Sequence, residues 1–331
     1  MVIVKTPLRV SFAGGGSDMA DFYLKEPGKV VSAAIDKFVY AIVKERFDDD
    51  IYINYSRKEC VSAVSDIRHD LVREAMKSAG VEKGIELTTL ADIPSSGSGL
   101  GSSSAVTVAL LHVLYAYRNI LVTAERLAEE ACRIEIDILG KPIGKQDQFA
   151  AAYGGVNRFV FLPDGSVDRL PLAMSGKEKR DFASLLFLYY TGISRKADAI
   201  LSVQKTNLAS SDKRAAMRKM VALADEFADA MEAGDIGSCG RILDENWRLK
   251  QTMASSISND EIRGMYDAAK KAGALGGKIA GAGGGGFMLL MAGRQNQAAV
   301  FESMKGRREL PFMFENSGSK VIFDDRSYSS K

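Results

Sequence analysis

The amino-acid sequence predicts an α+β protein of two domains. Its 331 residues correspond to two domains of the usual size, roughly 100–200 residues each. The first third is rich in β-branched and aromatic segments broken by Gly and Asp clusters, a pattern typical of strands. After Pro171 long amphipathic stretches follow, with apolar residues at helical spacing. We therefore expect an N-terminal domain over residues 1–172 and a C-terminal domain over residues 173–331.

The composition is that of a soluble globular protein. Hydrophobic residues make up 46% and charged residues 26%, and the net charge of +2 gives no reason to expect nucleic acid or an anionic membrane as a partner. Cys60, Cys132 and Cys239 are far apart in the sequence, which indicates free thiols in a reducing compartment. No apolar run approaches the ~18 residues of a membrane span, and no signal peptide is recognisable. We expect a cytoplasmic protein.

The first domain is expected to contain both strands and helices. Helices are predicted over 66–79 with Asp66 as the cap, over Ser102–Tyr117, and over 123–139 with Thr123 as the cap. Between them lie runs of β-branched and aromatic residues bounded by turn residues. The expected strands are Val2–Ala13, Val30–Phe47, Ile51–Tyr55, Ile85–Ile93 and Gly154–Leu162.

The second domain is expected to be mainly helical. Leu185–Tyr190 and Phe287–Met291 have the pattern of buried strands, and a helix should span about 259–271. Seven further apolar residues recur at helical spacing and predict a helix face buried in the core, not a cofactor site. They are Met217, Met220, Val221, Ala224, Phe227, Ala228 and Met231.

Only two histidines are present, which narrows the chemistry. His112 lies in an apolar run, and we interpret it as a core residue. His69 lies in a polar segment, and we interpret it as a solvated helix residue. A Ser-His-Asp triad or a His-rich metal site is therefore not expected.

Three glycine-rich segments stand out, at Ala13–Asp18, Pro94–Ala105 and Lys278–Phe287. A single segment of this kind would favour a turn. The second one follows an expected strand and opens directly into an expected helix, so its N–H groups and the positive end of the helix dipole point at an anion. The hydroxyls of Ser102–Ser104 add donors, and one of them can bind Mg²⁺. The segment therefore predicts a phosphate site.

Two better-known phosphate motifs do not fit. A P-loop needs Ser or Thr after its Gly-Lys pair, but Gly277-Lys278 is followed by Ile279. A G-x-G-x-x-G match over 281–286 precedes an expected strand, whereas a dinucleotide site requires it to follow a strand and open a helix.

In this order and spacing, the three segments resemble the three motifs of the GHMP kinases, a family that includes galactokinase, homoserine kinase and mevalonate kinase. The resemblance covers nearly the whole chain. It implies an N-terminal α/β domain like that of ribosomal protein S5, a ferredoxin-like C-terminal α+β domain, and ATP as co-substrate. The residues that it assigns to ATP binding are Pro94, Ser96, Gly97, Gly99, Leu100, Gly101, Ser102, Ser103 and Ser104.

The same resemblance implies the metal site and the catalytic residues. It assigns Mg²⁺ to Ser103 and Glu135. Glu135 also lies on a mostly apolar stripe of its expected helix, where a carboxylate needs either a metal or a salt bridge as partner. Asp147 matches the catalytic aspartate of the family and Arg9 its partner arginine. Asp147 would act as a base or orient the acceptor hydroxyl, and a purely structural role as a helix cap is the alternative.

The acceptor site is assigned by resemblance as well. Galactokinases carry Glu-His at the positions of Gly15-Gly16, which disfavours galactose. The segments PLRVSFAGGGSD, GKQDQFAAAYGG, YYTGISR and KIAGAGGGGF are most similar to bacterial kinases of D-glycero-D-manno-heptose 7-phosphate, with fucokinase domains as close relatives. The residues assigned to the acceptor are Gly15, Gly16, Ser17, Asp18, Gly144, Asp147, Arg195, Gly283 and Gly284. The candidate cations for its phosphate are Lys141, Lys145, Arg195 and Lys196.

These assignments predict a sugar kinase that uses ATP and Mg²⁺ to phosphorylate the anomeric C1 hydroxyl of the heptose 7-phosphate, giving the 1,7-bisphosphate for a nucleotide-activated heptose. Two alternatives stay open. One is a kinase of fucose or another unphosphorylated sugar, and the other is a non-catalytic sensor of sugar and ATP. The presence of Ser103, Glu135, Asp147 and Arg9 argues against the sensor. The oligomeric state is also open, with a homodimer as one alternative.

Overall fold

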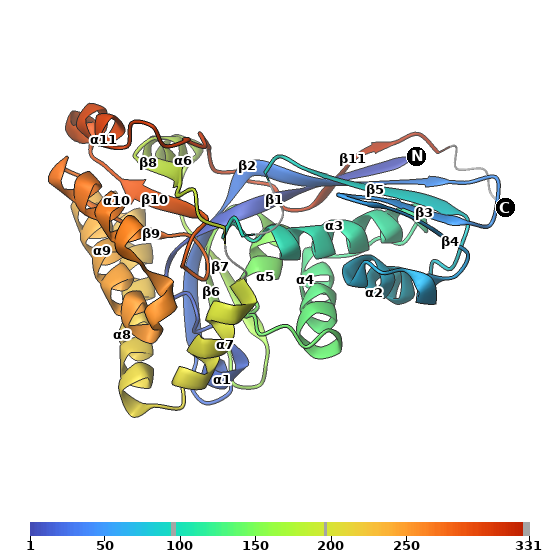
Figure 1. Ribbon diagram of the computed structural model, residues 1–331, viewed down its shortest axis with the longest axis horizontal. Coiled ribbons are helices and arrows are strands. Elements are labelled where there is room, and N and C mark those ends of the chain that lie inside the picture. Colours follow the sequence, from blue (N-terminus) through green and yellow to red (C-terminus); the bar gives the residue numbers. More distant parts are fainter. Residues whose placement is uncertain (94–96, 195–196, 327–331) are drawn as a thin grey trace.

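The computed structural model describes residues 1–93, 97–194 and 197–326. It contains a large mixed sheet with helices packed beneath it, and a small sheet with a second group of helices at the other end of the molecule (Figure 1). In the described residues the strand order of the large sheet is β11-β1-β2-β5-β3-β4, and β6 pairs with both β2 and β7. Its strands are β1 (Val2–Ala13), β2 (Gly28–Glu45), β3 (Ile51–Asn54), β4 (Lys58–Val61), β5 (Ile85–Ala91), β6 (Val156–Phe161), β7 (Val167–Pro171) and β11 (Lys320–Asp324).

The long strand β2 organises the large sheet because it pairs with three other strands. β1 runs antiparallel to it over most of its length. β6 pairs with the first residues of β2, from Gly28 to Ala33, and β5 pairs with the last, from Val39 to Glu45. β3 then adds to β5 in parallel. The glycine-rich segment that follows β1 is therefore held at the centre of the molecule.

Four helices lie beneath this sheet, α2 (Asp70–Ala79), α3 (Ser102–Tyr117), α4 (Ala124–Cys132) and α5 (Gln146–Tyr153) (Figure 1). Helix α3 packs against both β1 and β2, and 12 of its 16 residues are buried. A helix that is enclosed on most sides needs an apolar sequence all round, which explains the run AVTVALLHVLYAY. The short elements of this half are α1 (Ala20–Tyr23), η1 (Val64–Asp66) and the π-helical turn η2 (Arg133–Ile138).

The small sheet is antiparallel and has the order β8 (Leu186–Tyr190), β10 (Phe287–Met291), β9 (Gly276–Ile279). Helices α8 (Ser211–Glu232) and α9 (Ile236–Met253) pack against each other beside it. The seven apolar residues at helical spacing, from Met217 to Met231, lie on α8, where six of them are buried and Val221 is partly buried. Their interpretation as a core face is confirmed. The other elements are α6 (Gly176–Ala183), α7 (Ala197–Asn207), η3 (Ser255–Ile257), α10 (Asp260–Lys271), η4 (Arg294–Asn296) and α11 (Gln297–Ser303).

The last strand, β11, returns to the edge of the large sheet and pairs antiparallel with β1. The small sheet and helices α6 to α11 all follow residue 172, so we keep a boundary between residues 172 and 173 as a proposal. In this division β11 is a C-terminal segment that packs on the N-terminal domain.

Two details of the expected helices are wrong. Helix α2 begins at Asp70 and its N-cap is His69, not Asp66, which lies in the separate turn η1. The cause is a long-range contact, since the Glu59 carboxylate accepts hydrogen bonds from the backbone N–H groups of Arg68 (2.7 Å) and His69 (3.1 Å) and holds this stretch outside the helix. His69 is therefore not a solvated helix residue.

The helix expected over 123–139 ends as an α-helix at Cys132. Thr123 is its N-cap, as predicted, and accepts a hydrogen bond from the N–H of Arg126. The chain then continues in η2, where the N–H of Leu139 bonds to the carbonyl of Ile134, five residues back. The extra residue in this turn changes which side chains face inward.

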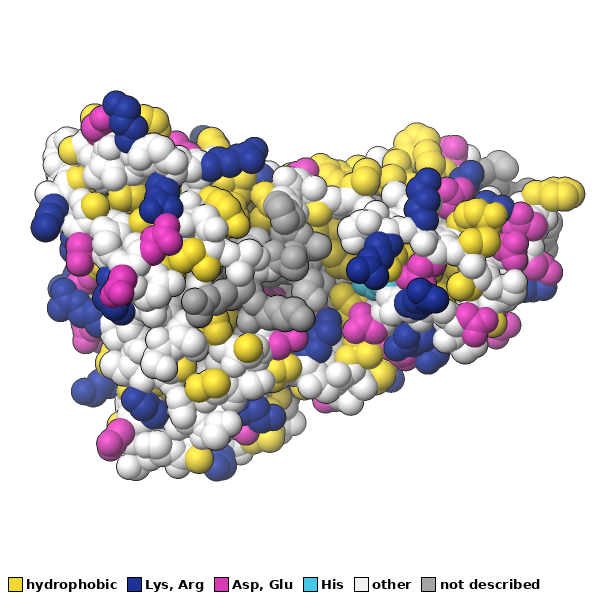
Figure 2. Space-filling view, in the orientation of Figure 1, with side chains coloured by type: hydrophobic (Ala, Val, Ile, Leu, Met, Phe, Trp, Pro, Cys, Tyr) yellow, Lys and Arg dark blue, Asp and Glu magenta, His cyan; other side chains and the backbone are white. Residues whose placement is uncertain are grey.

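His112 is a core histidine, as predicted. Its Nδ1 lies 2.8 Å from Ser319 Oγ, and burial lowers the pKa of its imidazole from 6.5 to about 4. The three cysteines form no disulfide. Among the described residues no helix combines the length and the apolar character needed to cross a membrane. On the face drawn in Figure 2, Lys and Arg side chains are interspersed with Asp and Glu.

Candidate active site

A cavity of about 440 Å³ lies where the three glycine-rich segments meet. Its lining comes from the end of β1 and the turn after it, the starts of α2 and α3, the turn before α5, helices α7 and α9, and strand β9 with the turn after it. This volume is in the range of small-molecule sites. Segments that are more than 200 residues apart in the sequence therefore form a single site.

The start of α3 lines one end of this cavity and has a geometry suited to an anion. The first N–H groups of a helix have no acceptor within the helix, and together with the helix dipole they favour an anion. Gly101 is the N-cap, with φ of +76°, a conformation that residues with a side chain rarely adopt. Ser98 Oγ lies 3.0 Å from Ser102 Oγ and ties the loop to the helix. Of the residues predicted for ATP, Pro94 and Ser96 lie outside the described residues.

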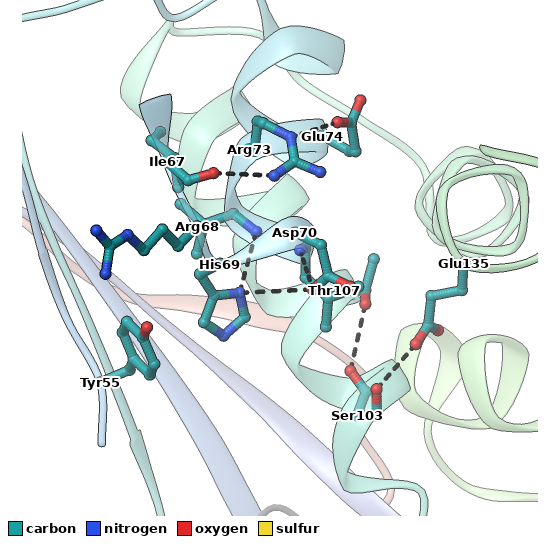
Figure 3. A network of polar contacts seen from close by, with 12 residues as sticks. Tyr55, Ile67, Arg68, His69, Asp70, Arg73, Glu74, Ser103, Thr107 and Glu135 are labelled. Carbon is teal, nitrogen blue, oxygen red and sulfur yellow. Dashed lines mark hydrogen bonds and ion pairs between the residues drawn. The ribbon is translucent and has the colours of Figure 1, made fainter. Parts of the chain in front are cut away.

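Ser103 and Glu135 are adjacent, as the metal assignment requires. Ser103 Oγ donates to Glu135 Oε1 at 3.0 Å, and Figure 3 shows the two side chains pointing toward each other from α3 and the turn η2. The Glu135 side chain is fully buried, and Gln148 Nε2 donates to its other oxygen at 2.7 Å. Lys141 Nζ lies 3.4 Å from both Ser103 Oγ and Glu135 Oε1.

The residues present fit a magnesium ion that is shared with a bound nucleotide. Among the described residues no three His, Cys, Asp or Glu side chains form a closed metal site. Mg²⁺ commonly uses one or two protein oxygens and takes its other ligands from phosphates and water. Ser103 supplies a hydroxyl in the cavity lining, and Glu135 supplies a buried carboxylate directly behind it. Lys141 shows that a cation is already accommodated beside them.

Arg9 and Asp147 form the centre of the cavity. Arg9 is 3% exposed, and its Nε and Nη2 donate to the two carboxylate oxygens of Asp147 at 2.8 Å each. Arg9 Nη1 also donates to the carbonyl of Gly99 at 2.6 Å, which links the pair to the phosphate loop. Asp147 lies in the first turn of α5 and packs against Gly101. The predicted contact between Arg9 and Asp147 is thus present in the structure.

Asp18 is the second carboxylate of the cavity. Its Oδ1 accepts hydrogen bonds from the N–H of Gly16 (2.9 Å) and from Gln146 Nε2 (3.2 Å), and its Oδ2 accepts one from the N–H of Gln146. Burial, and secondarily the charge of Asp147, raise the pKa of the Asp18 carboxyl. Gly144 packs so closely on Asp18 that a Cβ there would lie 2.0 Å from Oδ2. Gly144 is therefore needed for the position of Asp18.

Of the other described residues predicted for the acceptor, some line the cavity and others do not. Gly15 and Gly16 line the cavity beside Asp18. Ser17 is buried and donates its hydroxyl to the carbonyl of Gly14 at 2.8 Å, within its own turn. Gly283 and Gly284 pack on Ile257 and are not part of the described lining.

The predicted cations also differ in position. Lys141 faces the Ser103–Glu135 pair at the α3 end of the cavity. Lys145 donates to the carbonyl of Gly165 at 2.6 Å and is not among the lining residues. Arg195 and Lys196 lie outside the described residues. Lys145 reaches Asp18 only through its backbone, since its N–H donates to the Asp18 carbonyl at 3.2 Å.

Two lysines that the sequence analysis did not assign line the Asp18 end of the cavity. They are Lys250 on α9 and Lys278 on β9, and both are almost completely buried. Lys250 follows Trp247 by three residues and precedes Met253 by three, on the buried face of α9. The helical spacing that singled out Glu135 could have found Lys250 by the same reasoning. For Lys278 the available sequence signal is its place as the first residue of the third glycine-rich segment.

Two family models match the chain. The model for the GHMP kinases N terminal domain matches residues 64–155, and the model for the GHMP kinases C terminal region matches residues 227–308. The N-terminal match includes the loop before α3 and the helices that carry Glu135 and Asp147. The C-terminal match includes α9 and the small-sheet strands β9 and β10.

Individual relatives align over nearly the whole chain. The D-glycero-alpha-D-manno-heptose 7-phosphate kinase of Campylobacter jejuni is 30% identical over 330 residues, which cover 96% of this chain and 97% of that protein. A crystal structure described as a D-glycero-D-manno-heptose 1-phosphate kinase from Bacteroides thetaiotaomicron has a TM-score of 0.81 at 27% identity, and covers 99% of this chain and 100% of the other.

A third relative shares only part of its length. The L-fucokinase/L-fucose-1-P guanylyltransferase of Bacteroides fragilis is 27% identical over 89% of this chain, which matches 35% of that protein. The expected fold, with its N-terminal α/β and C-terminal α+β domains, is confirmed by the matching models and structures. With both domain models matched, a full-length relative at 30% identity and three glycine-rich motifs around one cavity, the chain belongs to the GHMP kinase family.

Proposed function

We propose that this protein transfers the γ-phosphate of ATP to the anomeric C1 hydroxyl of D-glycero-D-manno-heptose 7-phosphate, giving the 1,7-bisphosphate. The observation that carries the proposal is the Arg9–Asp147 pair, which lies between the start of α3 and the Asp18 end of one cavity. The heptose 7-phosphate kinase of Campylobacter jejuni supports this choice of acceptor. ATP and a reducing compartment are both available in the cytoplasm, where we place the reaction.

The phosphate chain of ATP would lie over the start of α3. The free N–H groups of that helix and the Ser102–Ser104 hydroxyls supply hydrogen bonds to its oxygens. Ser103 and Glu135 would hold Mg²⁺, which neutralises charge on the phosphates during transfer. Lys141, at 3.4 Å from Glu135, adds a positive charge at the same end. These residues position the γ-phosphate toward Asp147.

Asp147 would orient the acceptor hydroxyl and accept its proton. Because Arg9 bonds to both carboxylate oxygens, the side chain has one orientation relative to the phosphate loop. Phosphoryl transfer passes through a loose transition state, so orientation and charge neutralisation contribute more than proton removal alone. Asp18 would accept hydrogen bonds from sugar hydroxyls. Its raised pKa means that it can also donate one when it is protonated.

The similarity to fucokinase domains keeps an unphosphorylated sugar as the second candidate acceptor. A coupled assay of ADP release, run with heptose 7-phosphate, free heptose, fucose and galactose, separates the two. We expect kcat/KM for heptose 7-phosphate to exceed that for free heptose or galactose by at least about a hundredfold. ³¹P NMR of the product should show phosphate on the anomeric carbon. Equal or better activity on fucose would replace the heptose assignment, and binding of ATP and sugar without turnover would indicate a sensor.

A further inference from the structure

Two buried ammonium groups lie at the Asp18 end of the cavity. Lys250 is 4% exposed and Lys278 is 2% exposed, yet both side chains line the cavity together with Gly15 and Gly16. Neither residue has a role in holding the nucleotide or in the Arg9–Asp147 pair. Their position therefore calls for a separate explanation.

Both ammonium groups bond only to neutral oxygens in the described residues. Lys250 Nζ donates to the carbonyl of Gly15 and to Gln204 Oε1, each at 3.0 Å. Lys278 Nζ donates to the carbonyl of Ser11 at 2.9 Å and approaches Ser11 Oγ at 3.3 Å. No described carboxylate oxygen comes within the 4.0 Å of an ion pair with either of them. One N–H of each ammonium is left over for another partner.

Burying a charge without an ion-pair partner costs free energy, and here two ammonium groups of the same sign are buried. Burial lowers the pKa of Lys250 to about 8. Burial, followed by the charges of Lys250 and Arg9, lowers the pKa of Lys278 to about 7. Side chains that only fill space would be more stable there as apolar residues. The charge of Asp18 acts on both lysines and partly offsets these shifts, but neither lysine has an ion pair with it, and a ligand with two negative charges would supply a direct partner.

The absence of a side chain at position 16 lets Gln204 and Lys250 pack directly against Gly16, which lines the cavity. A Cβ on Gly16 would lie 3.3 Å from Lys250 Nζ and 2.4 Å from Gln204 Nε2. Gln204 is completely buried, and its Nε2 has no hydrogen-bond partner among the described residues. A buried amide donor without an acceptor and an ammonium with one N–H left over therefore lie against the same glycine of the cavity lining. Hydrogen-bond donors without an acceptor are rare in protein interiors.

We propose that Lys250 and Gln204, with Lys278 beside them, form an anion-binding subsite that takes the phosphate group of the acceptor sugar. The subsite rests on the proposed function, since it names the groups that would select a sugar phosphate over a free sugar. Of the cations expected from the sequence, Lys141 faces the Ser103–Glu135 pair, Lys145 bonds to Gly165, and Arg195 and Lys196 lie outside the described residues.

The same donors would also suit the γ-phosphate of ATP. The phosphate of the acceptor and the phosphate of ATP must therefore be distinguished as ligands of the subsite. Lys250 bonds to Gly15, on the acceptor side of Asp18, whereas the nucleotide loop contacts Arg9. We therefore assign the subsite to the acceptor. The decisive comparison is one enzyme variant on a matched pair of acceptors, with and without the phosphate.

The test uses Lys250→Gln and Gln204→Leu, with Lys270→Gln as the control. Lys270 is a partly buried lysine on α10 that donates to the carbonyl of Leu275, outside the cavity. We expect Lys250→Gln to lower kcat/KM for heptose 7-phosphate by about a hundredfold and for free heptose by less than about threefold. Gln204→Leu should act in the same direction by about tenfold. ATP affinity in calorimetry and the Lys270→Gln enzyme should both match the wild type.

Equal losses on both acceptors would overturn the proposal, because Lys250 would then act on the transferred phosphate. Unchanged kinetics on both acceptors would overturn it too. Calorimetry without ATP tests the subsite apart from the reaction, using heptose 7-phosphate, mannose 6-phosphate and the two free sugars. If the wild type binds only mannose 6-phosphate and Lys250→Gln abolishes that binding, the subsite stands and the heptose assignment falls. If no phosphorylated sugar binds better than its free form, the subsite falls.

A fold control completes the test. We expect the melting temperature of Lys250→Gln without ligand to stay within about 3 °C of the wild type, because the substitution removes a buried charge along with two hydrogen bonds. The rise in melting temperature that heptose 7-phosphate causes in the wild type should be lost in the variant. A variant that melts much earlier would be replaced by Lys250→Met, which keeps the apolar stem, and the same comparison of acceptors then decides.

Discussion

Arg9 and Asp147 are 138 residues apart in the sequence and are joined by two hydrogen bonds of 2.8 Å. Arg9 belongs to β1 and Asp147 to the first turn of α5, so the pair connects a strand of the large sheet to the helices beneath it. A bidentate guanidinium–carboxylate contact fixes distance and direction together. It gives the first prediction.

Replacing Asp147 by Asn should reduce turnover and leave ATP binding intact. The amide cannot accept a proton and cannot accept both hydrogen bonds from Arg9. We expect kcat to fall by about 10²–10⁴-fold, the usual contribution of a positioned acid or base. Steady-state kinetics give kcat, and calorimetry with ATP provides the control. If kcat stays within a factor of a few of the wild type, Asp147 has only a structural role through its contact with Arg9, since the N-cap of α5 is Lys145.

Ser103→Ala and Glu135→Gln should each weaken the binding of magnesium. Each variant removes one of the two oxygens that we assign to the ion, and we expect kcat at fixed Mg²⁺ to fall by about ten- to a thousandfold. Titration of activity with MgCl₂ should show a higher midpoint. Glu129→Gln is a matched control because Glu129 is exposed on α4, six residues before Glu135. Normal Mg²⁺ titrations for both site variants would remove the metal assignment.

The sequence could predict these residues because they lie in contiguous motifs. The phosphate loop opens into α3 within a few residues, and the ends of α3 match the expected Ser102 and Tyr117. The N-cap of α2 could not be predicted this way. Asp is a better N-cap than His by propensity, but Glu59 on the separate strand β4 sets where this helix begins. Such a contact exists only in the folded protein.

The inward position of Glu135 was predicted for a reason that was only partly right. Helical spacing placed it on an apolar stripe, and it is indeed buried. The structure shows that it lies in a π-helical turn, in which the hydrogen bonds run five residues back instead of four. Turns of this kind are rare and often occur at functional sites. Propensity alone gives no signal for them.

His112 should make the protein sensitive to acid. Its pKa is 6.5 in the unfolded chain and about 4 in the folded protein, so below pH 6.5 the unfolded chain binds a proton that the folded protein does not. Stability should therefore fall as the pH drops from 6.5 to 4, by at most about 3 kcal/mol from this residue. His112→Gln can keep a hydrogen bond to Ser319 and cannot titrate. Urea unfolding at pH 7 and pH 4.5 should show a smaller loss for the variant, and equal losses would contradict the assignment.

Lys250 and Lys278 should affect stability and acceptor binding in opposite directions as the pH rises. The pKa values of Lys250 and Lys278 are about 8 and about 7 in the folded protein and 10.5 in the unfolded chain. Between the folded and the unfolded pKa of each lysine, the unfolded chain therefore binds more protons than the folded protein. The free energy of unfolding should therefore increase from pH 7 to pH 9, by as much as about 3 kcal/mol relative to a Lys250→Met, Lys278→Met double variant.

Binding of a phosphorylated acceptor should weaken over the same range, because the ammonium groups that pair with the phosphate lose their protons. Arg9 and Asp18 also act on these lysines; Arg9 stays charged throughout this range, and burial raises the pKa of the Asp18 carboxyl. Urea unfolding and calorimetry with heptose 7-phosphate, both at pH 7 and pH 9, measure the two trends on the same protein. Stability that falls with pH in the wild type relative to the double variant would show that the two lysines are not buried charges. Acceptor affinity that is independent of pH would show that they do not bind the phosphate.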